Sequence, residues 1–207
     1  MIPPFRVYLF DVDGTLTDSA ADICGATQQV LRASGRDDVP DSLLRSYIGR
    51  HLFDLFEDLG FPRSSHAQML LDYRAIYAAG GHSTTRVFPG VPEMLASLGG
   101  LKSTATTKGT PMTRVVLEQF GLLKFFNHVQ GTDGFPAKPE PDVIMKSLEI
   151  FNVGPKECLM IGDAPSDMEA GRRAGVKTCA VRYGYGDQAQ MAQFTPDYWI
   201  DRPSDLI

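Results

Sequence analysis

The segment that most constrains the fold of this chain is an apolar run followed by two aspartates, Val7-Tyr8-Leu9-Phe10-Asp11-Val12-Asp13-Gly14-Thr15. Four apolar residues in succession indicate a strand buried on both faces, as in a parallel sheet. The two carboxylates then lie at the carboxyl end of that strand, where open α/β sheets bind ligands. Crowded carboxylates repel each other unless a cation or protons offset their charge. The pattern therefore favours a site at this strand end where a metal ion and a phosphate meet.

The size and composition of the chain fit one α/β domain with a modest insertion. Of its 207 residues 43% are hydrophobic, and 20 basic against 25 acidic residues give a net charge of −5. No Lys/Arg run interrupts that balance, so neither nucleic acid nor an anionic membrane is an expected partner. The start of the chain has no signal-peptide pattern, and no apolar run is long enough to span a membrane. Cys24, Cys158 and Cys179 are interpreted as core thiols, which fits the cytoplasm.

The pattern of apolar residues divides the chain into two parts. Between residues 17 and 85 they recur at helical spacing in four stretches, and we expect no strand there. From Phe88 onward, strands and helices alternate, which predicts a parallel sheet with right-handed crossovers. We therefore predict a Rossmann-like three-layer α/β/α core domain of residues 1–16 and 86–207. An all-helical cap of residues 17–85 is inserted after the first strand, as a lid over the carboxyl ends of the strands.

Local signals predict where individual elements begin and end. Asp18 or Ser19 is expected to cap the first helix of the cap, and Asp41 the second. Thr110-Pro111 opens a helix of the core, because proline suits a first helical turn. Further strands are expected at 102–106, near 129, at 158–161, at 176–181 and, as an edge strand, at 198–200.

Four segments at strand ends or ahead of helices carry polar residues that can converge. They are Asp11 and Asp13, then Thr106-Thr107-Lys108, then Lys138, and finally Gly162-Asp163-Ala164-Pro165-Ser166-Asp167. Their order and types resemble the four motifs of the haloacid-dehalogenase-like (HAD) hydrolases, which are mostly phosphatases. Those motifs are DxDGT, a Ser/Thr after the second strand, a Lys near the start of a helix, and GDxxxD. The resemblance covers the whole chain, cap included, and all four motifs in order are far more specific than any one of them.

This resemblance implies a covalent mechanism at the first strand end. Asp11 would be the nucleophile, because a carboxylate can attack phosphorus and hold the phosphoryl group as an acyl phosphate. Asp13 would be the general acid for the leaving alcohol and then the base that activates water. The resemblance also implies Mg²⁺, held by the Asp11 carboxylate, the Asp13 backbone carbonyl and the Asp163 carboxylate, since hard oxygen ligands suit this ion.

The remaining motif residues are implied to bind phosphate or to support the site. Lys138 adds a fixed positive charge beside Asp11 and the phosphate. The Thr106 hydroxyl and the amides of Thr107 and Gly109 can hydrogen-bond phosphate oxygens. Asp167 would orient a metal-bound water or Lys138. Many relatives carry Asn at the position of Thr107, a departure that concerns substrate preference more than the reaction.

Comparison with sister families narrows the resemblance. Asp13 argues against 2-haloacid dehalogenases and phosphonoacetaldehyde hydrolases, which lack this aspartate. β-Phosphoglucomutases carry a histidine on the first cap helix, whereas residues 20–24 here contain none. The segments Asp18–Ile23 and Tyr47–Arg50 look most like phosphoglycolate phosphatases. In that reading Arg50 would reach a substrate carboxylate with two parallel hydrogen bonds.

The predicted function is a Mg²⁺-dependent phosphatase of small phosphomonoesters that works through an aspartyl-phosphate and resembles phosphoglycolate phosphatase. The alternatives are a nucleotide or pyrophosphate phosphatase and a β-phosphoglucomutase-like phosphotransferase. A non-catalytic phosphate-binding module is disfavoured, because mere binding has no use for the proton shuttle of Asp13. The expected partner is a small phosphoester, and the chain is expected to be a monomer or a homodimer.

Overall fold

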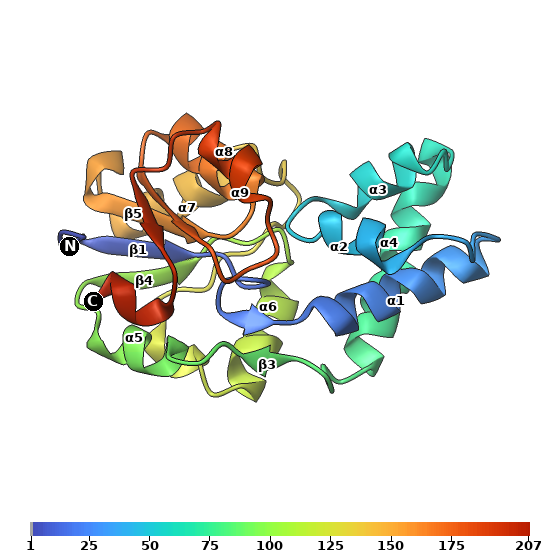
Figure 1. Ribbon diagram of the computed structural model, residues 1–207, viewed down its shortest axis with the longest axis horizontal. Helices are drawn as coiled ribbons and strands as arrows, with labels where there is room; N and C mark the ends of the chain where they lie inside the picture. The colour runs from blue at the N-terminus through green and yellow to red at the C-terminus, as the bar shows by residue number, and fades with distance from the viewer. Residues whose placement is uncertain (1) are drawn as a thin grey trace.

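A computed structural model describes residues 2–207 and has a parallel sheet at its centre (Figure 1). The strand order is β4-β1-β5-β6-β7, and every neighbouring pair is parallel. These strands are β1 (Val7–Phe10), β4 (Leu101–Thr104), β5 (Cys158–Gly162), β6 (Lys177–Val181) and β7 (Tyr198–Ile200). The predicted α/β fold is confirmed, and Tyr198–Ile200 forms an edge strand as expected.

Helices cover both faces of the sheet, because alternate residues of its strands point to opposite sides. On β1, Tyr8 and Phe10 belong to one apolar cluster and Val7 and Leu9 to another. The first cluster takes in side chains of α5 and α6, and the second those of α7 and α8. In Figure 1, α7 and α8 lie above the strands and α5 lies below them. These helices are α5 (Val91–Ser97), α6 (Thr110–Gln119), α7 (Asp142–Phe151), α8 (Pro165–Ala174) and the short α9 (Gln188–Ala192).

Four helices form a separate block on the right of Figure 1, beyond the ends toward which the strands run. They have an apolar core of their own, built around Leu31, Leu55, Phe56 and Met69. None of the helices in residues 2–207 has the length and apolar character needed to cross a bilayer. The four helices are α1 (Ala20–Ala33), α2 (Asp41–Ser46), α3 (Leu52–Asp58) and α4 (Arg63–Ala79).

The two connections between this helical block and the sheet domain pair with each other. The strand β2 (Thr17–Asp18) runs antiparallel to β3 (Arg86–Val87). Our expectation that residues 17–85 contain no strand is therefore wrong at Thr17–Asp18. A pair of two-residue strands is too short to show periodicity, and it forms because the chain leaves and re-enters the sheet domain at the same place.

The strand expected near Val129 is absent from the described chain, although Val129 itself is buried. The backbone of the residue after it bonds to a side chain of β4 and not to the β4 backbone. The Thr104 hydroxyl donates to the Gln130 carbonyl and accepts from the Gln130 N–H, both at 2.9 Å. One hydroxyl thus satisfies the backbone groups that a sheet ladder would otherwise use.

Two expected helix caps also differ in detail. Ser19 immediately precedes α1, but its hydroxyl donates to Asp13 and makes no capping bond. Asp41 is the first residue of α2, and Pro40 occupies the capping position. In both helices the acidic residue of the first turn, Asp22 or Asp41, still complements the helix dipole.

Candidate active site

The carboxyl ends of β1 and β5 bring three buried carboxylates together. Asp11 follows β1 directly, and its N–H donates to the Ile161 carbonyl of β5 at 2.9 Å. Asp163 follows β5, and Asp167 lies in the first turn of α8. Asp11 and Asp163 are 2% exposed, Asp167 is fully buried, and one carboxylate oxygen from each lies within 4.8 Å of the others. Parallel strands thus deliver the side chains that the sequence motifs single out to one point.

Lys138 inserts its ammonium group between two of these carboxylates. Its Nζ donates to Asp11 Oδ1 at 2.9 Å and also to Asp167 Oδ1, and its side chain is fully buried. Burial alone would lower the pKa of Lys138, but the charges of Asp11 and Asp167 outweigh it and raise the pKa above its usual range. Lys138 is therefore a permanent positive charge beside Asp11.

Even with Lys138 charged, the cluster carries an excess of negative charge. Burial raises the pKa of Asp163 to about 8, and Asp11 and Asp167 add to the effect. Burial also raises the pKa of Asp11 to about 6, although Lys138 opposes it. Three carboxylates against one ammonium group make a site that a further cation would stabilise.

The three carboxylates differ in how many of their oxygens already have donors. Asp167 uses both, since Oδ1 accepts from Lys138 and Oδ2 accepts from the Ala164 N–H at 2.9 Å. Asp163 also uses both, since its Oδ1 accepts from the Thr15 hydroxyl at 2.8 Å and its Oδ2 accepts from the Tyr185 N–H at 2.9 Å. Asp11 Oδ2 has no donor among residues 2–207, so it is the oxygen best placed to act on a ligand.

Asp13 is turned toward the helical block. Its Oδ1 accepts from the Ser19 hydroxyl at 2.7 Å, and its Oδ2 lies 3.2 Å from Lys108 Nζ. The same ammonium group lies 4.2 Å from the centre of the Tyr77 ring of α4. Sequence reasoning placed Lys108 in a motif segment but gave it no role. Its position two residues after Thr106, in a strand-end loop, was the available signal.

A glycine is required next to Asp13. Gly14 has a φ of +92°, and a Cβ there would lie 2.2 Å from Asp163 Oδ2. Any side chain at this position would therefore both strain the backbone and displace the Asp163 carboxylate. This explains physically why glycine follows the aspartate pair in the motif.

The loop after β6 contacts both Asp163 and the segment that leads into the helical block. The sequence did not predict this double contact. The Tyr185 N–H of this loop donates to Asp163, while the Tyr185 hydroxyl donates to Asp18 Oδ1 at 2.6 Å. The same hydroxyl accepts from the Ser19 N–H at 2.7 Å. Gly184 lets the loop approach, since a Cβ there would lie 2.3 Å from Asp163 Cβ. These contacts join segments far apart in the chain, and no local pattern announced them.

The loop after β4 supplies the candidate phosphate-binding groups. Thr106 is 1% exposed, and its Oγ1 accepts from the Lys108 N–H at 3.3 Å. Within residues 2–207, the Thr106 hydroxyl proton and the N–H groups of Thr107 and Gly109 have no acceptor. This loop therefore presents several unused donors at the same sheet edge as Asp11.

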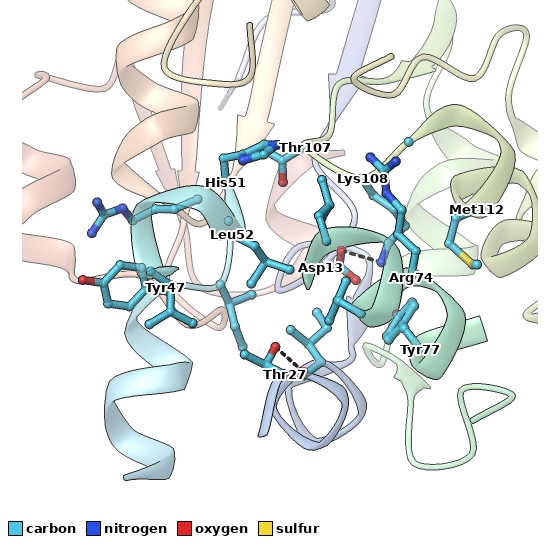
Figure 2. Close-up of a pocket in the computed structure, with 18 of the residues that line it drawn as sticks. Asp13, Thr27, Tyr47, His51, Leu52, Arg74, Tyr77, Thr107, Lys108 and Met112 are labelled. Carbon is cyan, nitrogen blue, oxygen red and sulfur yellow. Dashed lines mark hydrogen bonds and ion pairs between the residues drawn. The ribbon is translucent and has the colours of Figure 1, made fainter. Parts of the chain in front are cut away.

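A cavity of about 380 Å³ separates this edge of the sheet from the helical block (Figure 2). Asp13, Thr107 and Lys108 line it from the sheet domain, and Arg74 and Tyr77 of α4 line it from the helical block. Its volume lies within the range of pockets that bind small organic molecules.

Arg50, expected to bind a substrate carboxylate, lines this cavity but is not brought to the carboxylate cluster. Its Nε lies 3.3 Å from Asp54 Oδ2, and its guanidinium lies 4.4 Å from the centre of the Tyr47 ring. The adjacent Gly49 touches the sheet domain, where its carbonyl accepts from the Ser166 hydroxyl at 3.1 Å.

Known proteins are similar to this chain in sequence and in fold. The profile of the haloacid dehalogenase-like hydrolase family matches residues 8–181. A protein named phosphoglycolate phosphatase from Aquifex aeolicus is 32% identical over 206 residues, covering 98% of this chain and 95% of that one. Another of that name, from Vibrio parahaemolyticus, is 33% identical and covers 98% and 94%.

Solved structures agree with these sequence matches. A predicted phosphatase from Clostridium acetobutylicum superposes with a TM-score of 0.91 at 27% identity, covering 99% of this chain and 97% of that one. A haloacid dehalogenase-like family hydrolase from Streptococcus pneumoniae superposes with a TM-score of 0.89 at 26% identity, covering 98% and 96%.

The chain belongs to the haloacid dehalogenase-like hydrolase family, as its motifs predicted. Within that family it is most similar, among the relatives above, to proteins named phosphoglycolate phosphatase.

Proposed function

We propose that this protein is a Mg²⁺-dependent phosphatase that hydrolyses small phosphomonoesters, with phosphoglycolate as the leading candidate substrate. The observation that carries this proposal is the arrangement of Asp11. One of its oxygens is held by the buried Lys138, and the other has no donor. Two residues further on, Asp13 faces the cavity. A nucleophile and a proton carrier two residues apart at one strand end suit the cleavage of a phosphoester.

The residues fit a hard divalent cation. Buried carboxylates in excess of ammonium groups supply both the negative charge and the oxygen ligands that Mg²⁺ prefers. Asp11, Asp163 and the Asp13 backbone carbonyl would hold the ion, which is the ligand set that the family resemblance implies, and the Asp167 carboxylate would keep Lys138 in place. When bound, Mg²⁺ would neutralise charge on the phosphate as an anionic nucleophile approaches it.

In the first half of the proposed reaction, Asp11 Oδ2 attacks phosphorus and the bond to the leaving oxygen breaks. The Thr106 hydroxyl and the nearby free amides hold phosphate oxygens, while Lys138 offsets the charge on Asp11. Asp13 gives its proton to the departing alkoxide, so a neutral alcohol leaves and an acyl phosphate remains on Asp11.

In the second half, Asp13 acts in the opposite sense. As a carboxylate it takes a proton from water, which attacks phosphorus and releases inorganic phosphate and the free Asp11 carboxylate. Lys108, 3.2 Å from Asp13 Oδ2, and the Ser19 hydroxyl hold that carboxylate at the cavity wall. Asp167 would position Lys138 and would not touch the substrate.

The test is phosphate release from phosphoglycolate with Mg²⁺ and with chelator, in the natural protein and in Asp11→Asn. We expect chelator-sensitive release that the Asp11→Asn change abolishes. Asp72→Asn is the matched control, because Asp72 is an exposed aspartate of α4 whose side chain bonds, within residues 2–207, to Gln68 alone. Full activity in Asp11→Asn would contradict the covalent mechanism, and release insensitive to chelator would contradict the metal requirement.

A further inference from the structure

The positive charges around the cavity are not equally free to bind a ligand. Arg50 is engaged by Asp54 and lies on the Tyr47 ring, and Lys108 pairs with Asp13. The His51 ring accepts from the Phe53 N–H, and burial lowers its pKa, so it is neutral near pH 7. Arg74 lines the same cavity and takes part in no ion pair among residues 2–207.

Arg74 lies on the side of the cavity where the leaving group would be. Figure 2 shows Lys108 and Tyr77 beside Asp13, with Arg74 on the same side of the cavity and Tyr47 on the opposite side. The guanidinium of Arg50 lies over Tyr47, so it belongs to the far side. Among residues 2–207, Arg74 is therefore the cation without an ion-pair partner on the side where Asp13 would protonate the leaving group.

The other residues that line the cavity leave an anion few groups to bind besides Arg74. Much of the lining is apolar, including Ile23, Leu52 and Leu70, and offers an anion nothing to bond with. The other carboxylate of the lining, Asp133, already accepts from the Thr110 N–H at 3.0 Å at the start of α6. Among residues 2–207, Arg74 is therefore the cation of the helical block that lines the cavity and has no ion-pair partner, so it can bind an anionic group that enters with the substrate.

We propose that Arg74 is the specificity-determining residue of the cap, and that it binds a second anionic group, a carboxylate or a phosphate, on the leaving group of the substrate. This inference rests on the proposed function. It assigns to α4 the role that the sequence suggested for Arg50. A guanidinium suits the task because its planar fork gives two parallel hydrogen bonds to either anion.

The test compares two esters that differ in one charge. Phosphoglycolate carries a carboxylate, and hydroxyethyl phosphate has the same length with a neutral alcohol in its place. We expect the natural protein to favour phosphoglycolate in kcat/KM. In Arg74→Gln the ratio of the two kcat/KM values should fall by about tenfold or more, since an interaction with a charged partner is lost. Arg74→Lys should restore part of the ratio.

Two other arginines serve as controls. Arg63→Gln changes an exposed residue of the same helix that pairs with Glu57 and does not line the cavity, so the ratio should not change. If Arg50→Gln lowers the ratio and Arg74→Gln does not, the proposal is overturned. A third ester, ethylene glycol bisphosphate, tells whether the anion recognised is a carboxylate or also a phosphate.

A binding measurement separates this inference from the proposed function. Calorimetric titration of Asp11→Asn with phosphoglycolate and with hydroxyethyl phosphate, in Mg²⁺, gives an affinity ratio that needs no turnover. If that ratio falls when Arg74→Gln is added, the inference stands even if the natural protein releases no phosphate. An unchanged ratio, or no binding of either ester, would overturn it.

Discussion

Replacing Asp167 by asparagine should damage the active site without touching the substrate. Asp167 accepts from two donors, the Lys138 ammonium and the Ala164 N–H at the start of α8. An amide has one acceptor oxygen, so Asp167→Asn can satisfy only one of them, and its NH₂ group then faces the other donor. The ammonium of Lys138 loses one of its two carboxylate partners while it stays fully buried.

The size of the effect follows from that loss. A hydrogen bond to a charged group contributes about 1.5–3 kcal/mol to stability. At about 2–4 °C per kcal/mol for a chain of this size, the Tm should fall by roughly 3–12 °C. We expect kcat to fall by about ten- to a hundredfold, as when a residue that orients a metal-site ligand is removed.

The pH dependence distinguishes a positioning role from a merely structural one. The charge of Asp167 raises the pKa of both Asp11 and Asp163, so its removal should lower both. The acidic limb of the kcat/KM profile should therefore move to lower pH, which a general loss of stability would not cause. The assays are thermal unfolding and phosphate release across pH.

The matched control is Glu169→Gln, on the same helix. Glu169 forms an exposed ion pair with Arg173, so its loss should change the free energy of unfolding by no more than about 0.5 kcal/mol. If Asp167→Asn keeps the natural Tm and the natural pH profile, Asp11 alone holds Lys138 and our reasoning is refuted.

Three further predictions follow from the same contacts. Tyr185→Phe removes the hydroxyl that bonds Asp18 and the N–H groups at the start of α1, so the Tm should fall and the KM should rise. An unchanged KM would mean that this hydroxyl does not position the helical block. Gly14→Ala places a Cβ where Asp163 Oδ2 lies, so Mg²⁺ affinity by calorimetry should fall sharply, and natural affinity would contradict the close approach. Without metal, the pKa of Asp163 is about 8 in the folded protein and about 4 in the unfolded chain. Between about pH 4 and about pH 8 the folded state therefore binds one more proton than the unfolded state. The contribution of Asp163 to the free energy of unfolding falls as pH rises through this range. Mg²⁺ competes with that proton, so the rise in Tm on adding Mg²⁺ should grow from about pH 5 to about pH 8, and a rise independent of pH would refute this.

Much of the arrangement of the candidate site could be predicted, because its parts are local in sequence and neighbouring strands bring them together by a general rule. Asp11 and Asp163 each directly follow a buried strand, and neighbouring parallel strands end at the same edge of a sheet. Predicting Lys138 required more information, because only its place in an ordered set of motifs distinguished it from a surface lysine. Its insertion between Asp11 and Asp167 follows from the fold and not from its own neighbours in the chain.

What could not be predicted depends on how the helical block packs against the sheet domain. The sequence pointed to Arg50 and gave no role to Arg74, whereas the structure shows that Arg50 is engaged by Asp54 and that Arg74 lines the cavity with no ion-pair partner among residues 2–207. The contacts of Lys108 with Tyr77 and of Tyr185 with Asp18 also join segments distant in the chain. Helical periodicity predicts the buried face of each helix, but not which exposed residues face a shared cavity.

The measurement that tests the central claim most directly is the trapping of the covalent intermediate. The protein would be mixed with phosphoglycolate and Mg²⁺, quenched in acid within the first turnover and digested, and its peptides would be analysed by mass spectrometry. We predict one added phosphoryl group on Asp11, absent in Asp11→Asn and without substrate. Full turnover with no label on Asp11 at any quench time, or a label on another residue, would contradict the assignment of Asp11 as the nucleophile.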